Sequence, residues 1–352
     1  MKSRVVLSIA LTGLLAGCGG ASIDGGSTAP ASGSKSCSAA ILSCVDISSL
    51  RVAKYKDDKV SAASFTFDDG YESDYKVVAP TFEKYGYRAS FYLIVRNNTD
   101  KTWAIWRDIS ARGHEIGNHS WSHILLDNTS LTETDLEREI NSSQAYIESH
   151  IGKKPLIFVF PGNHSNARAV DMVMANHIAT RTTTFPVSGK YKIFNYNHTT
   201  TADSANHVLD VTVQRGGWFV AAGHGVDTGY EPINMDVLKG QLQYATDHAS
   251  ELWVDTYEHV AKYELELAKS SVSYNTISSS KIGISLQVDR PVAEFDFPLT
   301  VVVPIYKNTA ATYTVVDDVG HDLAVMPGAD GKELLIEIPP NSHAVLESHP
   351  SP

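Results

Sequence analysis

The sequence predicts an α/β fold, a parallel sheet closed or nearly closed into a barrel with helices outside, followed by a small all-β domain. Strand-like and helix-like segments alternate over residues 61–269, an order that is typical of parallel sheets. The most reactive residue types of this region follow strand-like runs within a few positions, where a parallel barrel builds its active site. After this region only short strand-like runs remain, separated by Pro, Gly, Asn and Asp.

The spacing of apolar residues distinguishes helices from strands in the first region. The clearest helix covers residues 132–151, where apolar residues recur on one face. Thr132 and Asp135 resemble a capping box at its start, although Glu or Gln is usual at the second position. The other expected helices cover residues 74–85, 103–112, 234–248 and 257–269. The expected strands cover residues 61–67, 88–95, 114–117, 156–160, 218–222 and 252–255.

The last part of the chain is expected to form a small sandwich. Its strand-like runs cover residues 281–288, 299–303, 311–316 and 334–338. The sequence of this part contains no cluster of catalytic residue types. We therefore expect a domain that packs against the barrel, and its few aromatic residues give little support to a carbohydrate-binding role.

The first residues resemble an export signal. Lys2 and Arg4 precede an apolar run, residues 5–15, that is too short for a permanent membrane-spanning helix and is typical of a secretory signal peptide. Leu15-Ala16-Gly17-Cys18 resembles the lipobox of bacterial lipoproteins. This resemblance implies an exported lipoprotein of the cell envelope, anchored to the outer membrane or cell surface by a lipid on Cys18. The alternative is an ordinary signal peptide that contains a cysteine.

These patterns divide the chain into four parts. The residues that follow Cys18 are rich in Gly, Ser, Ala and Pro, a composition that is typical of a flexible tether. The predicted parts are a lipoprotein signal peptide (1–17), a tether and lead-in (18–50), a catalytic domain (51–269) and a small β domain (270–352).

Charge and cysteine content narrow the classes of function. A net charge of -11 argues against nucleic acid as a partner. If Cys18 carries a lipid, then Cys37 and Cys44 are an even pair in an oxidising compartment, where either a disulfide or two free thiols would fit the sequence.

Two groups of residues point to metal chemistry. His119 and His123 are four positions apart, so their imidazoles would share one side if the stretch were helical, and both could bind one metal ion. Asp68 and Asp69 precede Gly70, and two adjacent carboxylates are costly to bury without a cation. Each group alone has a simpler explanation, either two surface histidines or an Asp-Gly turn.

Two histidines and one aspartate would leave metal positions open for water and substrate, as in catalytic zinc sites. Metalloproteases place a Glu beside the first histidine as their base, but this chain has Ser120 there. The base must therefore come from elsewhere, and the second aspartate of the pair is the obvious supplier. The order of a carboxylate followed by a close histidine pair does not favour a non-haem iron oxygenase.

These motifs resemble those of the polysaccharide deacetylases, the NodB-homology group also called family-four carbohydrate esterases. The resemblance covers roughly residues 60–263 and depends on Thr66-Phe67-Asp68-Asp69-Gly70, His119-Ser120-Trp121-Ser122-His123 and Gly223-His224. It implies a distorted (β/α) barrel of the NodB-homology type that binds zinc, or a related divalent ion such as cobalt or nickel.

The resemblance also implies a role for each motif residue. Asp69, His119 and His123 would hold the metal. Asp68 would be the general base that takes a proton from the attacking water. His224 would protonate the leaving amine or alcohol, a task that suits the pKa of an imidazole, although a structural histidine in a Gly-rich turn fits this residue equally well.

The chain departs from the family pattern at two motifs. The third motif of the family carries an arginine ahead of its proline, but here the stretch at residues 158–163 has none, and Arg181 or Arg215 could replace it. The acidic residue of the fourth motif is also absent beside Trp218, and Asp255 could instead orient a site histidine. Backbone NH groups after Pro161 would form part of an oxyanion hole. The candidate substrate-binding residues are Pro161, Gly162, Asn163, Arg181 and Trp218, of which Trp218 also fits a core position.

Three functions remain open on this basis. The first is N-deacetylation of a GlcNAc polymer of the chitin or peptidoglycan type. The second is O-acetyl ester hydrolysis on a xylan-type polysaccharide, which would use the same attacking groups. The third is a catalytically silent, glycan-binding lipoprotein, which the missing arginine supports and the intact Asp and His set opposes.

Overall fold

The computed structural model describes residues 44–181, 191–306 and 311–350, all of which belong to one compact unit. The expected signal peptide and tether, with Cys18 and Cys37, lie outside the described residues. Cys44 is disulfide-bonded. Within the described part of the chain, the model has no helix long and apolar enough to cross a membrane.

A parallel sheet forms the centre of the first domain. Its strands are β2 (Ser61–Asp69), β3 (Ser90–Leu93), β4 (Glu115–Asn118), β5 (Ile157–Phe158), β6 (Ala179–Thr180), β7 (Tyr191–Asn195), β8 (Trp218–Gly223) and β9 (Leu252–Val254). Their order is β6-β5-β4-β3-β2-β8-β7, with β9 paired to β2. The ladders are parallel, and no ladder joins β6 to β7 among the residues described, so the sheet is a half-barrel. The prediction of an α/β fold with a distorted barrel is confirmed.

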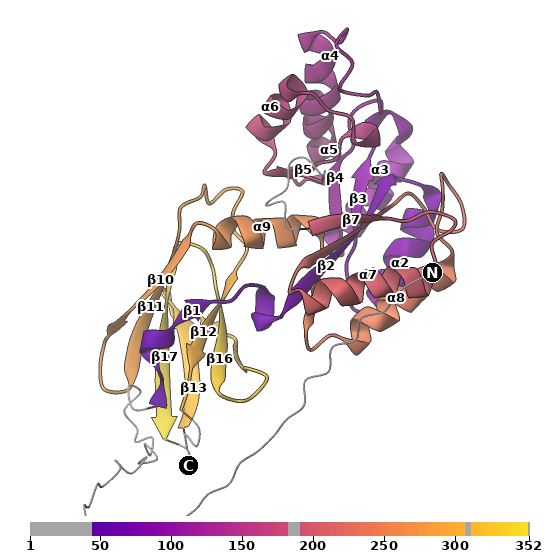
Figure 1. The fold of residues 1–352 in the computed structure, drawn as a ribbon. Helices are drawn as coiled ribbons and strands as arrows, with labels where there is room; N and C mark the ends of the chain where they lie inside the picture. Colours follow the sequence, from indigo (N-terminus) through magenta and orange to yellow (C-terminus); the bar gives the residue numbers. More distant parts are fainter. Residues whose placement is uncertain (1–43, 182–190, 307–310, 351–352) are drawn as a thin grey trace, which may run out of the picture. The chain divides into compact units, whose positions relative to one another are not determined.

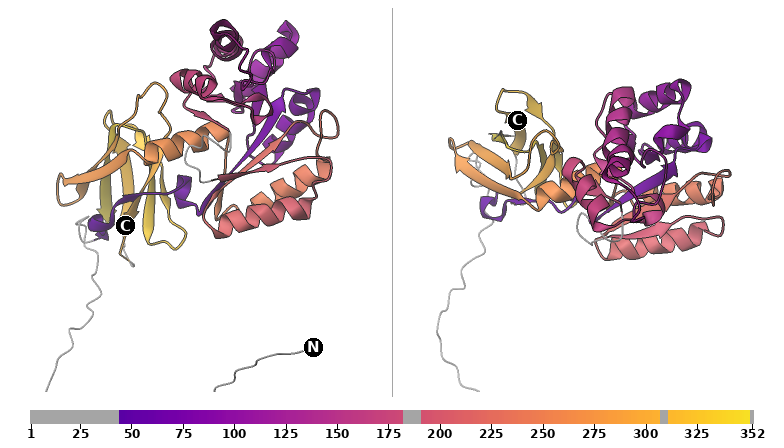
Figure 2. Two further views of the ribbon diagram at one scale, coloured as in Figure 1. Left: turned by 45° about the horizontal axis from the view of Figure 1, so that its top comes forward. Right: turned by 90° about the horizontal axis from the view of Figure 1, so that it is seen from above.

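Helices cover the sheet, which explains why β2 is buried on both faces along almost its whole length. They are α2 (Ala79–Lys84), α3 (Asp100–Ala111), α4 (Glu133–Glu137), α5 (Ser143–Ile151), α6 (Ala167–Asn176), α7 (Ala202–Gln214), α8 (Met235–Asp247) and α9 (Tyr257–Leu267). α7 packs beside α8, and α3 packs against α5 (Figures 1 and 2).

The expected helix over residues 132–151 is interrupted. Thr132 and Asp135 form the capping box as predicted, each side chain accepting a hydrogen bond from the backbone of the other residue. α4 then passes into a π-helical turn, Arg138–Ser142, before α5 begins. A π-helical turn holds one more residue than an α-helical turn, so an apolar spacing pattern does not reveal it.

The C-terminal part forms two antiparallel sheets, as the sequence predicted (Figure 1). Its strands are β1 (Arg51–Val52), β10 (Ser270–Thr276), β11 (Lys281–Val288), β12 (Leu299–Pro304), β13 (Ala311–Asp317), β14 (Asp322–Leu323), β15 (Val325–Pro327), β16 (Glu333–Ile338) and β17 (Ser342–Pro350). One sheet has the order β1-β12-β16-β15, and the other has the order β10-β11-β17-β13-β14. Because β1 pairs with β12, the first residues of the segment expected to be the catalytic domain (51–269) belong to a sheet of the C-terminal domain instead.

The two domains share one hydrophobic core. Apolar residues of α9 belong to the same buried cluster as the inner faces of β11, β12 and β16. The Tyr263 hydroxyl donates a 3.0 Å hydrogen bond to the carbonyl of Ala53, which directly follows β1. The Trp253 and Phe297 rings lie 5.8 Å apart, which further joins the barrel to the sandwich.

A buried carboxyl group at this junction makes stability depend on pH. Burial raises the pKa of Glu266 to about 8, although the backbone NH of Phe297 and the ammonium of Lys262 oppose this rise. The folded state therefore holds the proton more tightly than the unfolded state. The resulting stability is present below the ordinary pKa of Glu and is lost as the pH rises through about 8.

We expect the free energy of unfolding to decrease as the pH rises from about 5 to about 9, and Glu266→Gln to remove part of that decrease. Gln keeps an acceptor for the NH of Phe297 and cannot ionise. Urea denaturation across this pH range measures the effect, with Glu148→Gln on the exposed face of α5 as the control. Identical pH profiles for wild type and Glu266→Gln would contradict the assignment.

Candidate active site

Polar side chains at or just after the ends of five strands lie at one edge of the parallel sheet. Asp69 ends β2 and Asn195 ends β7, while His119, Arg181 and His224 directly follow β4, β6 and β8. Since the carboxyl ends of parallel strands lie at the same edge, these side chains converge on one cavity of about 620 Å³. The cavity is lined by Asp68, Asp69, His119, His123, Gly162, Asn163, Arg181 and His224, all named from the sequence.

The backbone turns at the end of β2. Asp69 has a φ of 74°, and so does Gly70. The turn that was expected at Gly70 therefore begins one residue earlier, in a left-handed conformation that is costly for a residue other than glycine. A Cβ on Gly70 would lie 2.8 Å from the Leu93 side chain, so this position has no room for another residue. The turn lets two consecutive carboxylates line the same cavity.

Asp69, His119 and His123 offer three ligand atoms that lie within 4.8 Å of one another. The Nε2 atoms of His119 and His123 are 3.5 and 3.6 Å from Asp69 Oδ1. His119 Nδ1 donates a 2.7 Å hydrogen bond to the Val159 carbonyl, which leaves Nε2 free to bind. Asp69 Oδ1 is buried without a hydrogen-bond partner, and burial lowers the pKa of His119, which favours its neutral, ligand form. This donor set fits a divalent cation.

The sequence left open whether the stretch that carries His119 and His123 is helical, and the structure shows that it is not. Residues 119–123 form a loop without helical structure, in which Ser120 and His123 have φ values of 69° and 60°. The two imidazole rings lie 4.8 Å apart because of this loop.

Arg181 takes the place of the arginine that the third motif lacks. Its Nη1 and Nη2 atoms donate hydrogen bonds of 2.9 and 2.5 Å to the two carboxylate oxygens of Asp68. Both residues are buried. Burial by itself raises the pKa of Asp68, but the charge of Arg181 and its hydrogen bonds oppose this effect, and the pKa lies below its ordinary value. Arg215, the other candidate, is exposed at the end of α7.

His224 lines the cavity without the carboxylate that was expected to orient it. Asp255 accepts a 2.8 Å hydrogen bond from His259 Nδ1, so it orients a histidine of α9. His224 Nδ1 is buried and has no hydrogen-bond partner in the described structure. The ring of Tyr230 stands edge-on to the His224 imidazole at 5.0 Å.

The structure also changes the assignment of Trp218 and Pro161 as candidate substrate-binding residues. Trp218 begins β8, at the end of the strand away from His224, and its Nε1 donates to Ser64 Oγ at 3.1 Å within the core. It therefore does not bind substrate. Pro161 is buried, whereas Gly162 and Asn163 line the cavity.

The oxyanion-hole assignment after Pro161 also changes. The backbone NH groups of Asn163 and His164 donate to the carbonyls of Phe160 and Pro161 at 2.9 and 3.0 Å. Neither of these two NH groups is therefore available to a substrate oxygen, so the prediction of an oxyanion hole now rests on the NH group of Gly162, a residue that lines the cavity.

Seven residues that the sequence did not single out also line the cavity. Tyr230 is the most exposed of the large apolar side chains near the site, at 60%. Asn195 ends β7 and Tyr196 follows it, and the apolar pattern did not predict this strand. The only signal in the sequence that could have located these two residues is the short run of strand-forming residues at 191–195. The seven are Tyr71, Phe160, Asn195, Tyr196, Ala222, Tyr230 and Glu231.

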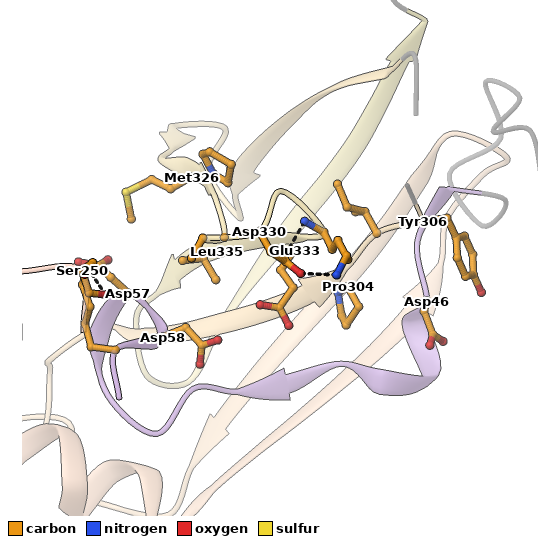
Figure 3. A pocket seen from close by; sticks show the side chains of 16 residues that line it. Asp46, Asp57, Asp58, Ser250, Pro304, Tyr306, Met326, Asp330, Glu333 and Leu335 are labelled. Atoms are coloured by element: carbon orange, nitrogen blue, oxygen red, sulfur yellow. Dashed lines mark hydrogen bonds and ion pairs between the residues drawn. The ribbon is translucent and has the colours of Figure 1, made fainter. Parts of the chain in front are cut away.

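A second cavity, of about 680 Å³, lies over the C-terminal sheets and differs in its chemistry (Figure 3). It is lined by carboxylates such as Asp58, Asp330 and Glu333 together with Pro304 and Met326, and no histidine takes part. Among the described residues, only the Asp69, His119 and His123 group brings three potential ligand atoms together. The edge of the parallel sheet is therefore the candidate active site.

Comparison with known proteins gives relatives of several activities. A gellan lyase of Bacillus sp is 23% identical over 287 residues, which cover 72% of this chain and 11% of that protein. A peptidoglycan-N-acetylglucosamine deacetylase of Bacillus cereus is 31% identical over 104 residues, 29% of this chain and 47% of that protein. A family 4 acetyl xylan esterase from Clostridium thermocellum, solved with a cobalt ion, is 22% identical with a TM-score of 0.43, covering 57% of this chain and 90% of that one.

The chain thus spans less than half the length of these two curated relatives. Residues 55–179 match the model of the polysaccharide deacetylase family. This segment encloses both Asp68-Asp69 and the His119–His123 loop. The family match supports a polysaccharide deacetylase domain in this chain.

Proposed function

We propose that this chain hydrolyses acetyl groups from a polysaccharide with the help of a divalent cation, zinc by preference, and that its substrate is an N-acetylated GlcNAc polymer. The observation that carries the proposal is the buried Asp68–Arg181 ion pair beside the three-ligand group in one cavity. The matches to a peptidoglycan-N-acetylglucosamine deacetylase and to the polysaccharide deacetylase family support this choice of substrate.

Asp69, His119 and His123 would hold the cation, which would act as a Lewis acid toward water and the acetyl carbonyl. Asp68 can accept a proton from the attacking water. Both of its oxygens face Arg181, which keeps the carboxylate ionised and fixed in orientation. The bidentate guanidinium contact limits rotation of the carboxylate and so maintains a position for proton transfer.

His224 can donate a proton to the leaving amine or alcohol. It directly follows β8, which lies on the opposite side of β2 from β4, the strand that precedes His119. A proton donor on this side of the cavity would face the leaving amine, while the acetyl group lies near Asp69, His119 and His123. The exposed ring of Tyr230 beside it offers an apolar surface for a sugar ring.

A silent glycan-binding protein is the second candidate. The observation in its favour is the buried His224 Nδ1 atom without a hydrogen-bond partner. An imidazole without a hydrogen-bond partner is not held in one orientation, so it donates a proton to a bound substrate less effectively. Acetate release separates the two candidates directly.

We expect the purified chain to release acetate from N-acetylated chitin or peptidoglycan fragments, with xylan acetate esters as the comparison substrate. Asp68→Asn should lower the rate by about a hundredfold to ten-thousandfold while keeping the metal, since it removes a positioned base. Because this variant leaves Arg181 buried and unpaired, Asp68→Asn combined with Arg181→Met tests the same loss with both charges removed.

Asp255→Asn is the matched control, because Asp255 pairs with His259 outside the cavity. It should keep the wild-type rate. A folded wild type that binds metal and releases no acetate from any of these substrates would favour the silent protein. Faster release from xylan esters would favour the esterase.

We expect about one divalent ion per chain, by the ligand number of a mononuclear site. Asp69→Asn should weaken metal binding, with activity partly restored by excess zinc, and the double variant His119→Ala, His123→Ala should lose the ion. His164→Ala is the control, since His164 is an exposed histidine that pairs with Asp127. Elemental analysis of dialysed proteins gives the readout, and full metal content in the double variant would overturn the assignment.

We also propose that the protein is an exported lipoprotein of the cell envelope, anchored through Cys18, on the strength of the Leu15-Ala16-Gly17-Cys18 motif. Cells grown with a radioactive fatty acid should label the wild type and Cys37→Ser, but not Cys18→Ser. An unlabelled wild type would mean an ordinary secreted protein.

A further inference from the structure

The loop that carries His119 and His123 has a costly backbone conformation. Ser120 and His123 both have positive φ values, 69° and 60°, although neither is glycine. Such conformations persist only where the surrounding structure holds them. The loop is held by one hydrogen bond of its own, from the NH of His123 to Ser120 Oγ at 2.9 Å, and by contacts with other elements, such as that of the Arg96 NH with the Trp121 carbonyl at 3.0 Å.

Glu139 makes the strongest of these contacts. Its Oε2 accepts a 2.7 Å hydrogen bond from the backbone NH of Ser122, and its Oε1 accepts one of 2.5 Å from the Ser122 hydroxyl. The carbonyl of Glu139 also accepts the NH of Trp121 at 3.2 Å. One residue thus holds two consecutive loop residues that lie between the two histidines.

The π-helical turn Arg138–Ser142 makes a second set of contacts possible. The carbonyl of Ile140 accepts 3.1 Å and 2.8 Å hydrogen bonds from Asn118 Nδ2 and the Ser143 hydroxyl. The side-chain oxygen of Asn118 in turn accepts the NH of Ser120 at 3.0 Å. The π-helical turn therefore contacts the loop at its start through Asn118 and at its middle through Glu139.

A contribution to stability does not by itself explain why a carboxylate is buried at Glu139. Its exposed fraction is 2%, and in the described part of the chain no lysine, arginine or histidine forms an ion pair with it. Burying a carboxylate that has only neutral donors as partners costs free energy compared with an apolar side chain. A requirement for two hydrogen bonds with Ser122, one to its NH and one to its hydroxyl, accounts for a long polar side chain at this position.

We propose that Glu139, presented by the π-helical turn, is a positioning residue that sets the affinity of the site for its divalent cation by holding the His119–His123 loop. It acts through Ser122 and touches neither the ligand atoms nor the substrate cavity. This inference rests on the proposed metal site. Loss of a residue that orients ligands typically lowers metal affinity by tenfold to a hundredfold.

Three variants separate positioning from charge. Glu139→Ala removes both acceptors, and we expect zinc affinity to fall by about tenfold to a hundredfold. Glu139→Gln removes the charge but keeps an acceptor for the Ser122 NH, and its amide can donate to the Ser122 hydroxyl, so affinity should stay close to that of the wild type. Ser122→Ala removes only the hydroxyl contact and should give an intermediate loss. Competition with a chelating dye on metal-free protein measures all three affinities.

Glu258→Ala is the control for stability. Glu258 is a buried carboxylate on α9 that pairs with Lys153 and Lys262 away from the loop, so its loss should lower the unfolding temperature without changing zinc affinity. The visible spectrum of the cobalt-loaded protein should change in Glu139→Ala and not in Glu258→Ala.

Equal losses in Glu139→Ala and Glu139→Gln would assign the effect to charge and overturn the proposal, as would wild-type affinity in Glu139→Ala. If Glu139→Ala does not fold, wild-type affinity in Ser122→Ala overturns it. A wild type that binds no zinc would instead refute the proposed function.

Discussion

The site depends on two adjacent carboxylates at the end of one buried strand. An unpaired carboxylate in a protein interior costs several kcal/mol. Arg181 offsets this cost for Asp68 through two hydrogen bonds. The backbone turn at Asp69 leaves Oδ1 buried with two histidine nitrogens nearby and no hydrogen bond. One carboxylate is therefore paired within the chain, and the other faces two imidazole nitrogens. Two identical side chains thus have different surroundings.

The parallel sheet makes this arrangement possible. Asp68 and Arg181 are far apart in sequence, yet β2 and β6 end at the same edge of one sheet. Arg181 reaches Asp68 beneath the cavity and lies over the ring of Tyr92 on β3, at 5.3 Å from its centroid. The cost of burying a guanidinium is thus reduced by a carboxylate on one side and an aromatic face on another. The strand ends position most of the polar side chains of the site, and the loops add the remaining ones.

The sequence was sufficient for those features that depend on local pattern. Apolar spacing located most helices and strands, and Asp68, Asp69, His119 and His123 were found because their residue types are costly or reactive. Arg181 could be named only as one of two candidates, because its role depends on β6, a two-residue strand with no periodicity to detect. The loop geometry of His119 and His123 was missed because spacing cannot show that Asn118 and Glu139 hold a non-helical backbone. Trp218 was partly misjudged because a tryptophan fits both a sugar site and a core.

The two sides of the cavity are held in different ways. Hydrogen bonds to the carbonyl of Val159, which follows β5, and to Glu139 of the π-helical turn hold the side with His119, and hydrogen bonds from Arg181 hold Asp68. The loop after β8 is closed by its own backbone, with the NH of Asp227 bonded to the carbonyl of Ile233 at 2.9 Å. That loop fixes the position of His224 but gives its Nδ1 no partner, and it leaves Tyr230 exposed. The departures of this chain from the family pattern therefore fall on different groups. The missing arginine is replaced at Asp68, whereas the missing acidic residue is not replaced at His224.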